Sequence, residues 1–415
     1  MAQGERQYEC VLLGATGYTG KYTAEHIATH LPTDFTWAIA GRSEAKLRAV
    51  ADELKQLNPD RKQPEIAVAQ LEKDDLVRLA KSTKVLITTV GPYVKYGTLV
   101  VEACAETGTH YLDVTGEVPW TYDMVHKHHE TAKRTGAIMI MQDGMESAPS
   151  DLLAWALVSH IRDTLNVGTE EVILTIWDMV AMPSGGSLAT ILGMYDAFTP
   201  SQLFKAQQPW SLCPVAPPQQ ISTKSIFERA SGARSDPDLG ALADSPQGIS
   251  DLPIVHRSWG LYDGGNFYGP KFRATAYMKA RNVVTACGFH LALTVIFAAL
   301  ALSPLRWLIK KYIYEPGQGP TKEQATKEYC EWRAAANADV DDPNDPQRAY
   351  ARMKWNGSMY HLTGVCLAES AFILAREKTL AHSLGGGMLT PATLGATYLE
   401  RLQKAGLELE VKMLP

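Results

Sequence analysis

Short apolar runs alternate with longer mixed segments through the first third of the chain. The mixed segments read as helices, among them Ser43–Leu57, Asp74–Lys81, Tyr96–Thr107 and Tyr122–Thr135. Strands that are apolar throughout and joined by helices are typical of a parallel sheet covered on both faces. We therefore predict a doubly wound α/β domain. Its predicted strands are Tyr8–Leu13, Phe35–Ala40, Glu65–Ala69, Val85–Val90, His110–Val114 and Ala137–Met141.

A glycine-rich turn follows the first predicted strand. The segment VLLGATGYTGK, Val11–Lys21, spaces three glycines three residues apart and leads into a helix-like stretch, Tyr18–Leu31. Glycines let a backbone approach a pyrophosphate, and the next helix directs free N–H groups at it. The spacing alone also fits a plain strand-to-helix corner, but its place after the first strand favours dinucleotide binding and a Rossmann-type domain. The predicted loop residues are Gly14, Ala15, Thr16, Gly17, Tyr18, Thr19 and Gly20.

The end of the second strand indicates which dinucleotide is bound. An NAD-preferring site usually has an acidic residue here for the ribose hydroxyl. The chain instead has Gly41, Arg42 and Ser43, with Lys46 one helical turn later. A guanidinium and a hydroxyl suit a 2′-phosphate, so we predict NADPH. The alternative is that Arg42 only caps the edge of the sheet.

Two further strand ends carry polar and aromatic residues. TTVGPYVKYG, Thr88–Gly97, ends the fourth strand, and its Val90, Gly91 and Pro92 are predicted to contact the cofactor while Tyr93 and Tyr96 face the nicotinamide. HYLDVTGE ends the fifth strand and groups Asp113, Thr115 and Glu117. In doubly wound sheets ligands bind at the carboxyl ends of the strands. Two such clusters at successive strand ends therefore predict one site.

The rest of the chain has a weaker alternation. EVILTIWDMV, Glu171–Val180, reads as a strand, and SGGSLAT follows it as the opening of a helix, with hydroxyls at Ser187 and Thr190, or as a flexible turn. Gln207–Gln220 and Ser231–Pro253 are rich in Pro, Gly, Ser or Asp and read as surface loops over the substrate.

One segment, Val283–Leu302, is apolar without a charged residue. As a helix it would be about 30 Å long, which is close to the thickness of a bilayer core. It could span a membrane, be buried in the fold or a homodimer, or lie on a lipid surface. Basic residues flank both ends: Lys279 and Arg281 before it, and Arg306, Lys310 and Lys311 after it. A span would separate the following residues from the rest of the folded unit, so we favour the lipid surface.

Composition narrows the classes of partner. The net charge of −5 and the lack of a long basic run argue against nucleic acid. Six scattered cysteines without a CxxC pair suit a reducing compartment and indicate no metal site. The polar N-terminus, MAQGERQYEC, predicts no secretory signal. We therefore expect an intracellular protein, cytoplasmic or associated with a membrane or lipid droplet.

Several motifs in order resemble those of the saccharopine dehydrogenase-like oxidoreductases, in particular the branch of trans-acting enoyl reductases. One stretch departs from the family, which usually reads CGFDSxPSD where this chain has DGMESAPSD, with Asp143, Met145 and Glu146 as the replacements. The matching segments are GATGYTGK, AGRS, TTVGPYVKYG, DVTGE, SAPSDL (Ser147–Leu152), SGGSLAT (Ser184–Thr190), PGQGP (Pro316–Pro320) and LTPATLG (Leu389–Gly395).

The resemblance implies a domain organisation and a location. It implies an NADPH-binding Rossmann domain over 1–150, an α+β substrate domain over 151–375, and a C-terminal segment, 376–415, that returns to the first domain. Relatives of this family are associated with lipid droplets, so the resemblance also implies contact with lipid.

The leading functional hypothesis is NADPH-dependent reduction of the C=C bond of an apolar, polyketide-like or acyl substrate, free or bound to a carrier. Tyr93 is the predicted acid, with Tyr96 second, while Asp113, Glu117 and Ser147 are predicted to orient substrate or nicotinamide. Reduction of an imine is an alternative, which would need paired arginines for an amino-dicarboxylate. A lipid-surface protein that binds NADPH without turnover is another.

Overall fold

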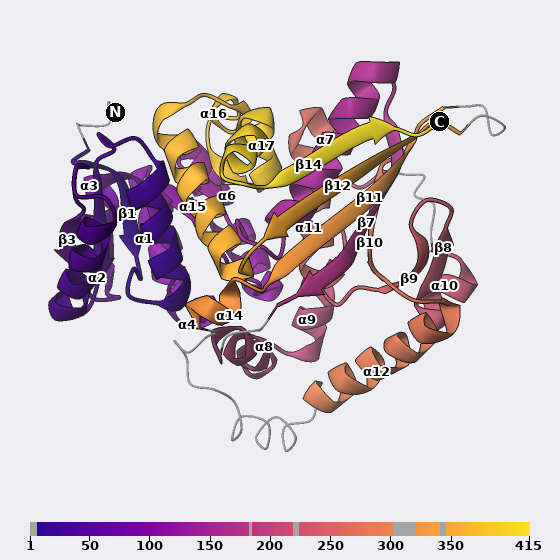
Figure 1. The fold of residues 1–415 in the computed structure, drawn as a ribbon, viewed down its shortest axis with the longest axis horizontal. Helices are drawn as coiled ribbons and strands as arrows, with labels where there is room; N and C mark the ends of the chain where they lie inside the picture. The colour runs from indigo at the N-terminus through magenta and orange to yellow at the C-terminus, as the bar shows by residue number, and fades with distance from the viewer. Residues whose placement is uncertain (1–5, 182–184, 219–223, 302–320, 341–345) are drawn as a thin grey trace.

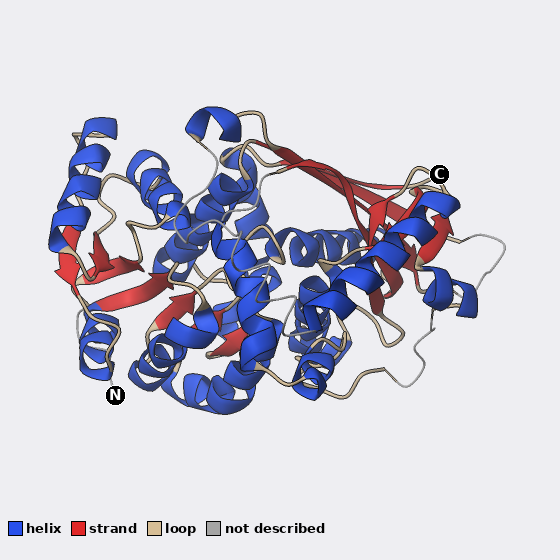
Figure 2. Ribbon diagram, turned by 90° about the horizontal axis from the view of Figure 1, so that it is seen from below, coloured by secondary structure: helices blue, strands red, loops and turns tan. Residues whose placement is uncertain are grey.

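The computed structural model describes residues 6–181, 185–218, 224–301, 321–340 and 346–415. It contains two sheets of seven strands each. Figure 2 shows them at opposite ends of the molecule, with helices between them. Ser184, Leu302, the PGQGP motif and three of the flanking basic residues, Arg306, Lys310 and Lys311, lie outside the described residues, as does the side chain of Ser187.

The first sheet is the predicted doubly wound parallel sheet, and the Rossmann-type fold is confirmed. Its order is β13-β6-β5-β4-β1-β2-β3, and every neighbouring pair is parallel. Six strands coincide with the predicted apolar runs, whereas β13 comes from near the C-terminus. The strands are β1 (Tyr8–Leu13), β2 (Trp37–Gly41), β3 (Glu65–Val68), β4 (Thr83–Thr88), β5 (His110–Leu112), β6 (Ile138–Ile140) and β13 (Gly387–Leu389).

Helices cover both faces of this sheet, and a hydrophobic cluster lies under each layer. The predicted helix Tyr96–Thr107 is observed from Thr98 to Thr107, because Tyr96 instead ends a separate short helix that begins at Tyr93. The last helix of the predicted set begins at Val118 rather than Tyr122, because Pro119 fits the first turn of a helix. The helices are α1 (Tyr18–His30), α2 (Glu44–Leu57), α3 (Lys73–Ser82), α4 (Tyr93–Tyr96), α5 (Thr98–Thr107), α6 (Val118–Thr135) and α15 (Met359–Arg376).

The second sheet is mixed and has the order β14-β12-β11-β7-β10-β9-β8. Only β7 and β10 pair in parallel; its other pairs are antiparallel. The predicted strand Glu171–Val180 is the end of the longer β7. The strands are β7 (Thr169–Val180), β8 (Ala233–Asp236), β9 (Gly240–Asp244), β10 (Arg273–Lys279), β11 (Tyr329–Ala338), β12 (Arg348–Asn356) and β14 (Glu408–Met413).

Further helices pack between the sheets or at their edges (Figure 1). SGGSLAT opens the helix α8, as one of the two interpretations expected. These helices are α7 (Ala148–Leu165), α8 (Gly185–Ala197), α9 (Pro200–Ala206), α10 (Ile226–Ser231), α11 (Gly248–Leu261), α12 (Val283–Ala301), α14 (Lys322–Ala325), α16 (Leu380–Ser383) and α17 (Gly395–Lys404), with 3-10 turns at Asp263–Gly265 and Pro391–Leu394.

The C-terminal part of the chain contributes to both sheets. The helix α15 packs on α1 so closely that a Cβ on Gly364 would lie 2.7 Å from the backbone nitrogen of Thr23. The chain then adds β13 to the first sheet and β14 to the second. The domain boundaries at 150 and 375 remain predictions, but the two units are tied together by this shared segment.

The apolar segment forms the helix α12, which lies along the outside of the molecule (Figure 1). Val284 is 79% exposed and Leu291 is 65% exposed. Within the described residues, α12 is the one helix with the length and apolar composition that a membrane crossing requires, and only 11% of its apolar window is buried. Burial inside the fold, one of the three interpretations, is therefore not what the structure shows.

Candidate active site

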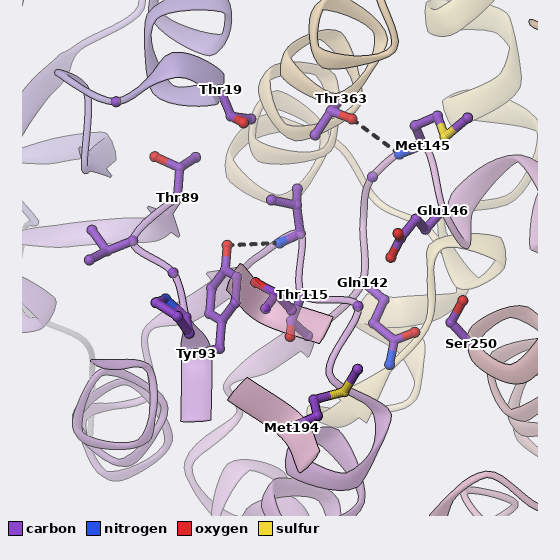
Figure 3. A pocket seen from close by; sticks show the side chains of 18 of the residues that line it. Thr19, Thr89, Tyr93, Thr115, Gln142, Met145, Glu146, Met194, Ser250 and Thr363 are labelled. Atoms are coloured by element: carbon purple, nitrogen blue, oxygen red, sulfur yellow. Dashed lines mark hydrogen bonds between the residues drawn. The ribbon is translucent and has the colours of Figure 1, made fainter. Parts of the chain in front are cut away.

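A cavity of about 760 Å³ lies where the strands of the first sheet end. The loops after β1, β2, β4, β5 and β6 line one side of it. Residues of α8, α9, α11, α12 and α15 line the other side. In Figure 3, Thr19 and Thr89 stand on one side, and Glu146, Gln142 and Ser250 on the other. Among the lining residues that the structure describes, only Arg42 and Glu146 carry a formal charge.

The glycine-rich loop has the shape that a pyrophosphate needs. Gly14 has a φ of +95°, a backbone angle that residues other than glycine rarely adopt. A Cβ on Gly20 would lie 2.2 Å from the carbonyl oxygen of Gly14, so the first turn of α1 can pack on the loop only with glycine there. The Gly17 amide donates to the Gly14 carbonyl at 2.9 Å, which closes the turn.

Five of the seven predicted loop residues line the cavity. Ala15 is buried beneath the loop, and Gly20 serves as the packing point of α1. The lining residues of the loop are Gly14, Thr16, Gly17, Tyr18 and Thr19. The tight turn, the helix that starts after it and the space in front of it together fit a dinucleotide.

Arg42 places a guanidinium group at the end of β2, beside the cavity. Gly41 and Arg42 line the cavity, and the exposed Arg42 side chain has no hydrogen bond or ion pair within the described part of the chain. It is therefore free to bind a phosphate, and no contact supports the alternative that it caps the sheet. Ser43 caps α2 by accepting a hydrogen bond from the Lys46 amide at 3.5 Å. Lys46 is exposed and does not line the cavity.

The loop after β4 forms the wall beside the expected nicotinamide position. Val90, Gly91, Pro92 and Tyr93 line the cavity. The Tyr93 hydroxyl donates to the Thr88 carbonyl at 3.1 Å and accepts from the Val114 amide at 3.4 Å. Burial and the nearby carboxylate of Asp113 raise the pKa of Tyr93 well above its ordinary value. The hydroxyl is thus tied to the backbone, whereas the ring forms part of the wall.

Two predicted site residues, Glu117 and Asp113, lie behind this wall. Glu117 accepts hydrogen bonds from the amides of Tyr93 and Val94 at 2.7 and 2.8 Å, which fixes the start of α4. Asp113 accepts from the Tyr111 hydroxyl and from the amides of Thr115 and Gln142. These buried carboxylates hold the loops after β4, β5 and β6 together but do not line the cavity.

Ser147 and Tyr96 are also off the cavity. The Ser147 hydroxyl lies 3.0 Å from Gln142 Oε1 and 3.5 Å from Asp251 Oδ1. Tyr96 is half-buried, and the ammonium of Lys95 lies 4.9 Å from the centre of its ring. The predicted roles of Asp113, Glu117, Ser147 and Tyr96 stay proposals, and none of the four lines the cavity.

The loop after β6 and the far side of the cavity contain residues that sequence reasoning missed. Gln142 and Glu146 follow a predicted strand, so the rule that ligands bind at strand ends could have found them. Thr363, by contrast, reaches the site from α15 and accepts a hydrogen bond from the Met145 amide at 3.2 Å. No local pattern indicates that contact. The remaining lining residues of this end are mainly apolar and include Met179, Met194, Leu203, Ile249, Phe297 and Met359.

Several buried carboxyls surround the start of α7 without a cation among the described residues. Asp151 accepts hydrogen bonds from the Ser258 hydroxyl at 2.6 Å and the Ala392 amide at 2.8 Å. Burial raises the pKa of Asp151 to about 7 and that of Asp143 to about 6. Burial also raises the pKa of Asp251, whose carboxylate accepts from the Ser150 hydroxyl. These three buried carboxyl groups therefore stay protonated at a higher pH than free carboxyl groups do.

Comparisons with known proteins agree with the geometry of the first domain. Residues 10–140 match the model of the saccharopine dehydrogenase NADP binding domain. The chain is 30% identical over 427 residues to a trans-acting enoyl reductase of Mycobacterium ulcerans, with 98% of each chain covered. It is 29% identical over 436 residues to a trans-acting enoyl reductase of Mycobacterium tuberculosis, again over 98% of each.

Among solved structures, the fold is similar to that of apo saccharopine dehydrogenase (L-Glu forming) from Saccharomyces cerevisiae. The TM-score is 0.56 at 12% identity, covering 98% of this chain and 99% of that one. At this identity the likeness concerns the fold alone.

Proposed function

This chain belongs to the saccharopine dehydrogenase-like oxidoreductases, in the branch of the trans-acting enoyl reductases, and from this membership we propose that it reduces an activated C=C bond of an apolar acyl substrate. It is an NADP-dependent oxidoreductase with NADPH as its cofactor. The observation that carries the proposal is the cavity itself. Its end at β1 is lined by a polar, glycine-rich loop that suits a phosphate, and its end at α8 and α12 is lined mainly by apolar side chains.

The first domain supplies the groups that would hold the cofactor. The loop from Gly14 to Thr19 offers backbone N–H groups and two threonine hydroxyls to the pyrophosphate. Arg42 would bind the 2′-phosphate, and the wall from Val90 to Pro92 would bound the nicotinamide. When bound there, NADPH supplies the hydride.

The far end of the cavity suits an apolar chain better than an amino-dicarboxylate. Arg234 and Arg273 are ion-paired with Glu171, at 2.6 and 3.0 Å. The buried Arg257 donates to the Met388 carbonyl, and none of these arginines lines the cavity. Recognition of two carboxylates needs such groups. The imine-reducing alternative is therefore disfavoured, while an acyl group fits the methionine and aromatic lining.

We further propose that α12 holds the protein against a lipid surface. Its outer face exposes Val284 and Leu291, and Lys279 and Arg281 precede it at the level where headgroups would lie. One helix residue, Phe297, also lines the cavity, so α12 borders both the exposed apolar surface and the substrate end of the cavity. An apolar substrate could pass from lipid to the site without crossing water.

A membrane crossing at α12 conflicts with the second sheet. The strand β10 precedes α12 and β11 follows it, and both pair with β7. One sheet cannot lie on both sides of a bilayer. We therefore propose that α12 lies on a membrane or lipid droplet rather than crossing a bilayer, and the intracellular location stays a proposal.

Two experiments test these proposals. The purified protein should oxidise NADPH when given trans-2-dodecenoyl-CoA and form the saturated thioester; no reaction with this or other enoyl thioesters would support binding without turnover. Flotation with liposomes, followed by protease treatment of a C-terminal tag, tests the lipid contact. We expect flotation with a cleavable tag. A dimer that does not float would instead place a second copy on α12.

A further inference from the structure

Glu146 occupies a particular place on the cavity wall. It follows β6 and precedes α7, and its side chain is exposed to the cavity (Figure 3). Its carboxylate lies against the loop after β5, where a Cβ on Gly116 would be 2.1 Å from Oε2. Gly116 and its neighbour Thr115 also line the cavity. The carboxyl group therefore stands beside the ends of β5 and β6, on the edge of the sheet where doubly wound folds bind their ligands.

The backbone of Glu146 is held, but its carboxyl group is not. The Glu146 carbonyl accepts a hydrogen bond from Gln247 Nε2 at 2.6 Å, and the preceding amide is bound by Thr363. The side chain has no hydrogen bond or ion pair with any residue that the structure describes. By contrast, Asp113, Glu117 and Asp151 each accept at least two hydrogen bonds and so stabilise the fold around them. No such role accounts for a free carboxyl group in the cavity.

Burial, without a nearby cation among the lining residues that the structure describes, favours the protonated form of Glu146. The other charged lining residue, Arg42, belongs to the opposite, cofactor end. Asp251, on α11, is close enough for the negative charge of Glu146 to raise the pKa of Asp251. Burial raises the pKa of Glu146 above its ordinary value. The remaining titratable lining groups are Tyr18 of α1, Tyr93 of α4, Tyr195 of α8 and Tyr360 of α15, none of which brings a positive charge.

We propose that Glu146 is the proton donor of the reduction. This rests on the proposed function. The substrate's β-carbon accepts a hydride, the C=C π bond breaks, and its electrons move to the carbonyl oxygen as an enolate. The enolate then takes the proton from the Glu146 carboxyl group at the α-carbon, which restores the C=O bond. Glu146 is left as a carboxylate and regains a proton from water, while NADPH leaves as NADP⁺.

The test compares Glu146→Gln with Glu146→Asp and with a matched control. Gln keeps the size of the side chain but has no acidic proton, whereas Asp keeps the acid. Glu400 is exposed on α17 and away from the cavity, so Glu400→Gln controls for the loss of one charge. With trans-2-dodecenoyl-CoA, E146Q should lower kcat by about 10²–10⁴-fold. NADPH affinity should not change, E146D should recover part of the rate, and E400Q should match the wild type.

Isotope placement distinguishes proton delivery from a structural effect. In D₂O the wild type should place deuterium on one face of the α-carbon, because one fixed group delivers it. The residual product of E146Q should carry deuterium on both faces, because water would then protonate the enolate. A single face at an unchanged rate in E146Q would overturn the proposal and return the role to Tyr93.

A titration tests Glu146 even if the enoyl thioester is not turned over. Infrared difference spectra of wild type against E146Q, recorded from about pH 5 to about pH 9, should show a protonated carboxyl that is lost on the alkaline side of the usual glutamate range. Ionisation of Glu146 at an ordinary glutamate pKa would refute its role as donor. If the enoyl thioester is not turned over but the Glu146 carboxyl signal is lost on the alkaline side as expected, only the proposed substrate class would be refuted.

Discussion

At the cofactor end the cavity wall is largely backbone, whereas at the substrate end it is side chain. The loop from Gly14 to Thr19 works because glycines leave room for the main chain to turn. The opposite end depends on which side chains α8, α11, α12 and α15 bring forward, such as Met194 and Phe297. A backbone site tolerates almost no added atoms, but a side-chain site can be reshaped one residue at a time. The two ends should therefore respond differently to substitution.

The largest effect is expected from Gly17→Val at the cofactor end. A Cβ at Gly17 would lie 3.3 Å from the Gly14 carbonyl, and the rest of a valine would occupy the space in front of the loop. Loss of two hydrogen bonds to a charged pyrophosphate should weaken NADPH binding by about 3 kcal/mol or more. Calorimetric titration with NADPH measures this. Met194→Ala, at the other end, is the control and should bind NADPH normally; wild-type affinity in G17V would refute the phosphate-loop assignment.

Arg42→Ala should act on the choice of cofactor. Because Arg42 has no partner among the described residues, its removal should not disturb the fold. NADPH binding should weaken by about 1.5–3 kcal/mol, the size of a hydrogen bond to a charged group, while NADH binding stays the same. Titration with both nucleotides gives the ratio. An unchanged ratio would show that the 2′-phosphate is bound elsewhere.

Phe297→Ala sharpens the comparison at the substrate end. Phe297 should be covered by the bound acyl chain, so its loss should lower kcat/KM for trans-2-dodecenoyl-CoA by the equivalent of about 1.5–3 kcal/mol, the free energy of burying an apolar side chain. The short trans-2-butenoyl-CoA would not reach it and should show almost no change. Steady-state rates for the two thioesters decide the matter. Equal losses for both chain lengths would place Phe297 outside the acyl site.

The cofactor end of the cavity could be predicted from the sequence better than the substrate end. The cofactor end is made of segments that each follow a strand directly, so glycines 14, 17 and 20 and the residue Arg42 could be found from local patterns. The strand β13 and the residue Thr363 join the site only through long-range packing, and no local pattern places them. Tyr93 follows a strand end, which predicts that its hydroxyl faces the ligand, but the hydroxyl instead donates a hydrogen bond to the Thr88 carbonyl.

The expected pH dependence of stability concerns the buried carboxyls behind the substrate end. Burial raises the pKa of Asp151 in the folded state to about 7, above the value of a free aspartate. The folded protein therefore binds more protons than the unfolded one, and stability falls as pH rises from about 4 to about 7. Asp151→Asn should flatten this fall, because the side chain that binds the extra proton is removed. Denaturant melts at several pH values measure it; stability that rises over this range would contradict the assignment.

Deuterium tracing in the wild-type protein tests the central claim most directly. NADPH deuterated at the transferable position of C4 is mixed with trans-2-dodecenoyl-CoA in ordinary water, and the product is analysed by mass spectrometry and NMR. The account predicts a saturated thioester with one deuterium at the β-carbon and one NADP⁺ formed for each product molecule. Deuterium at the carbonyl carbon, or NADPH that binds and is never consumed, would contradict it.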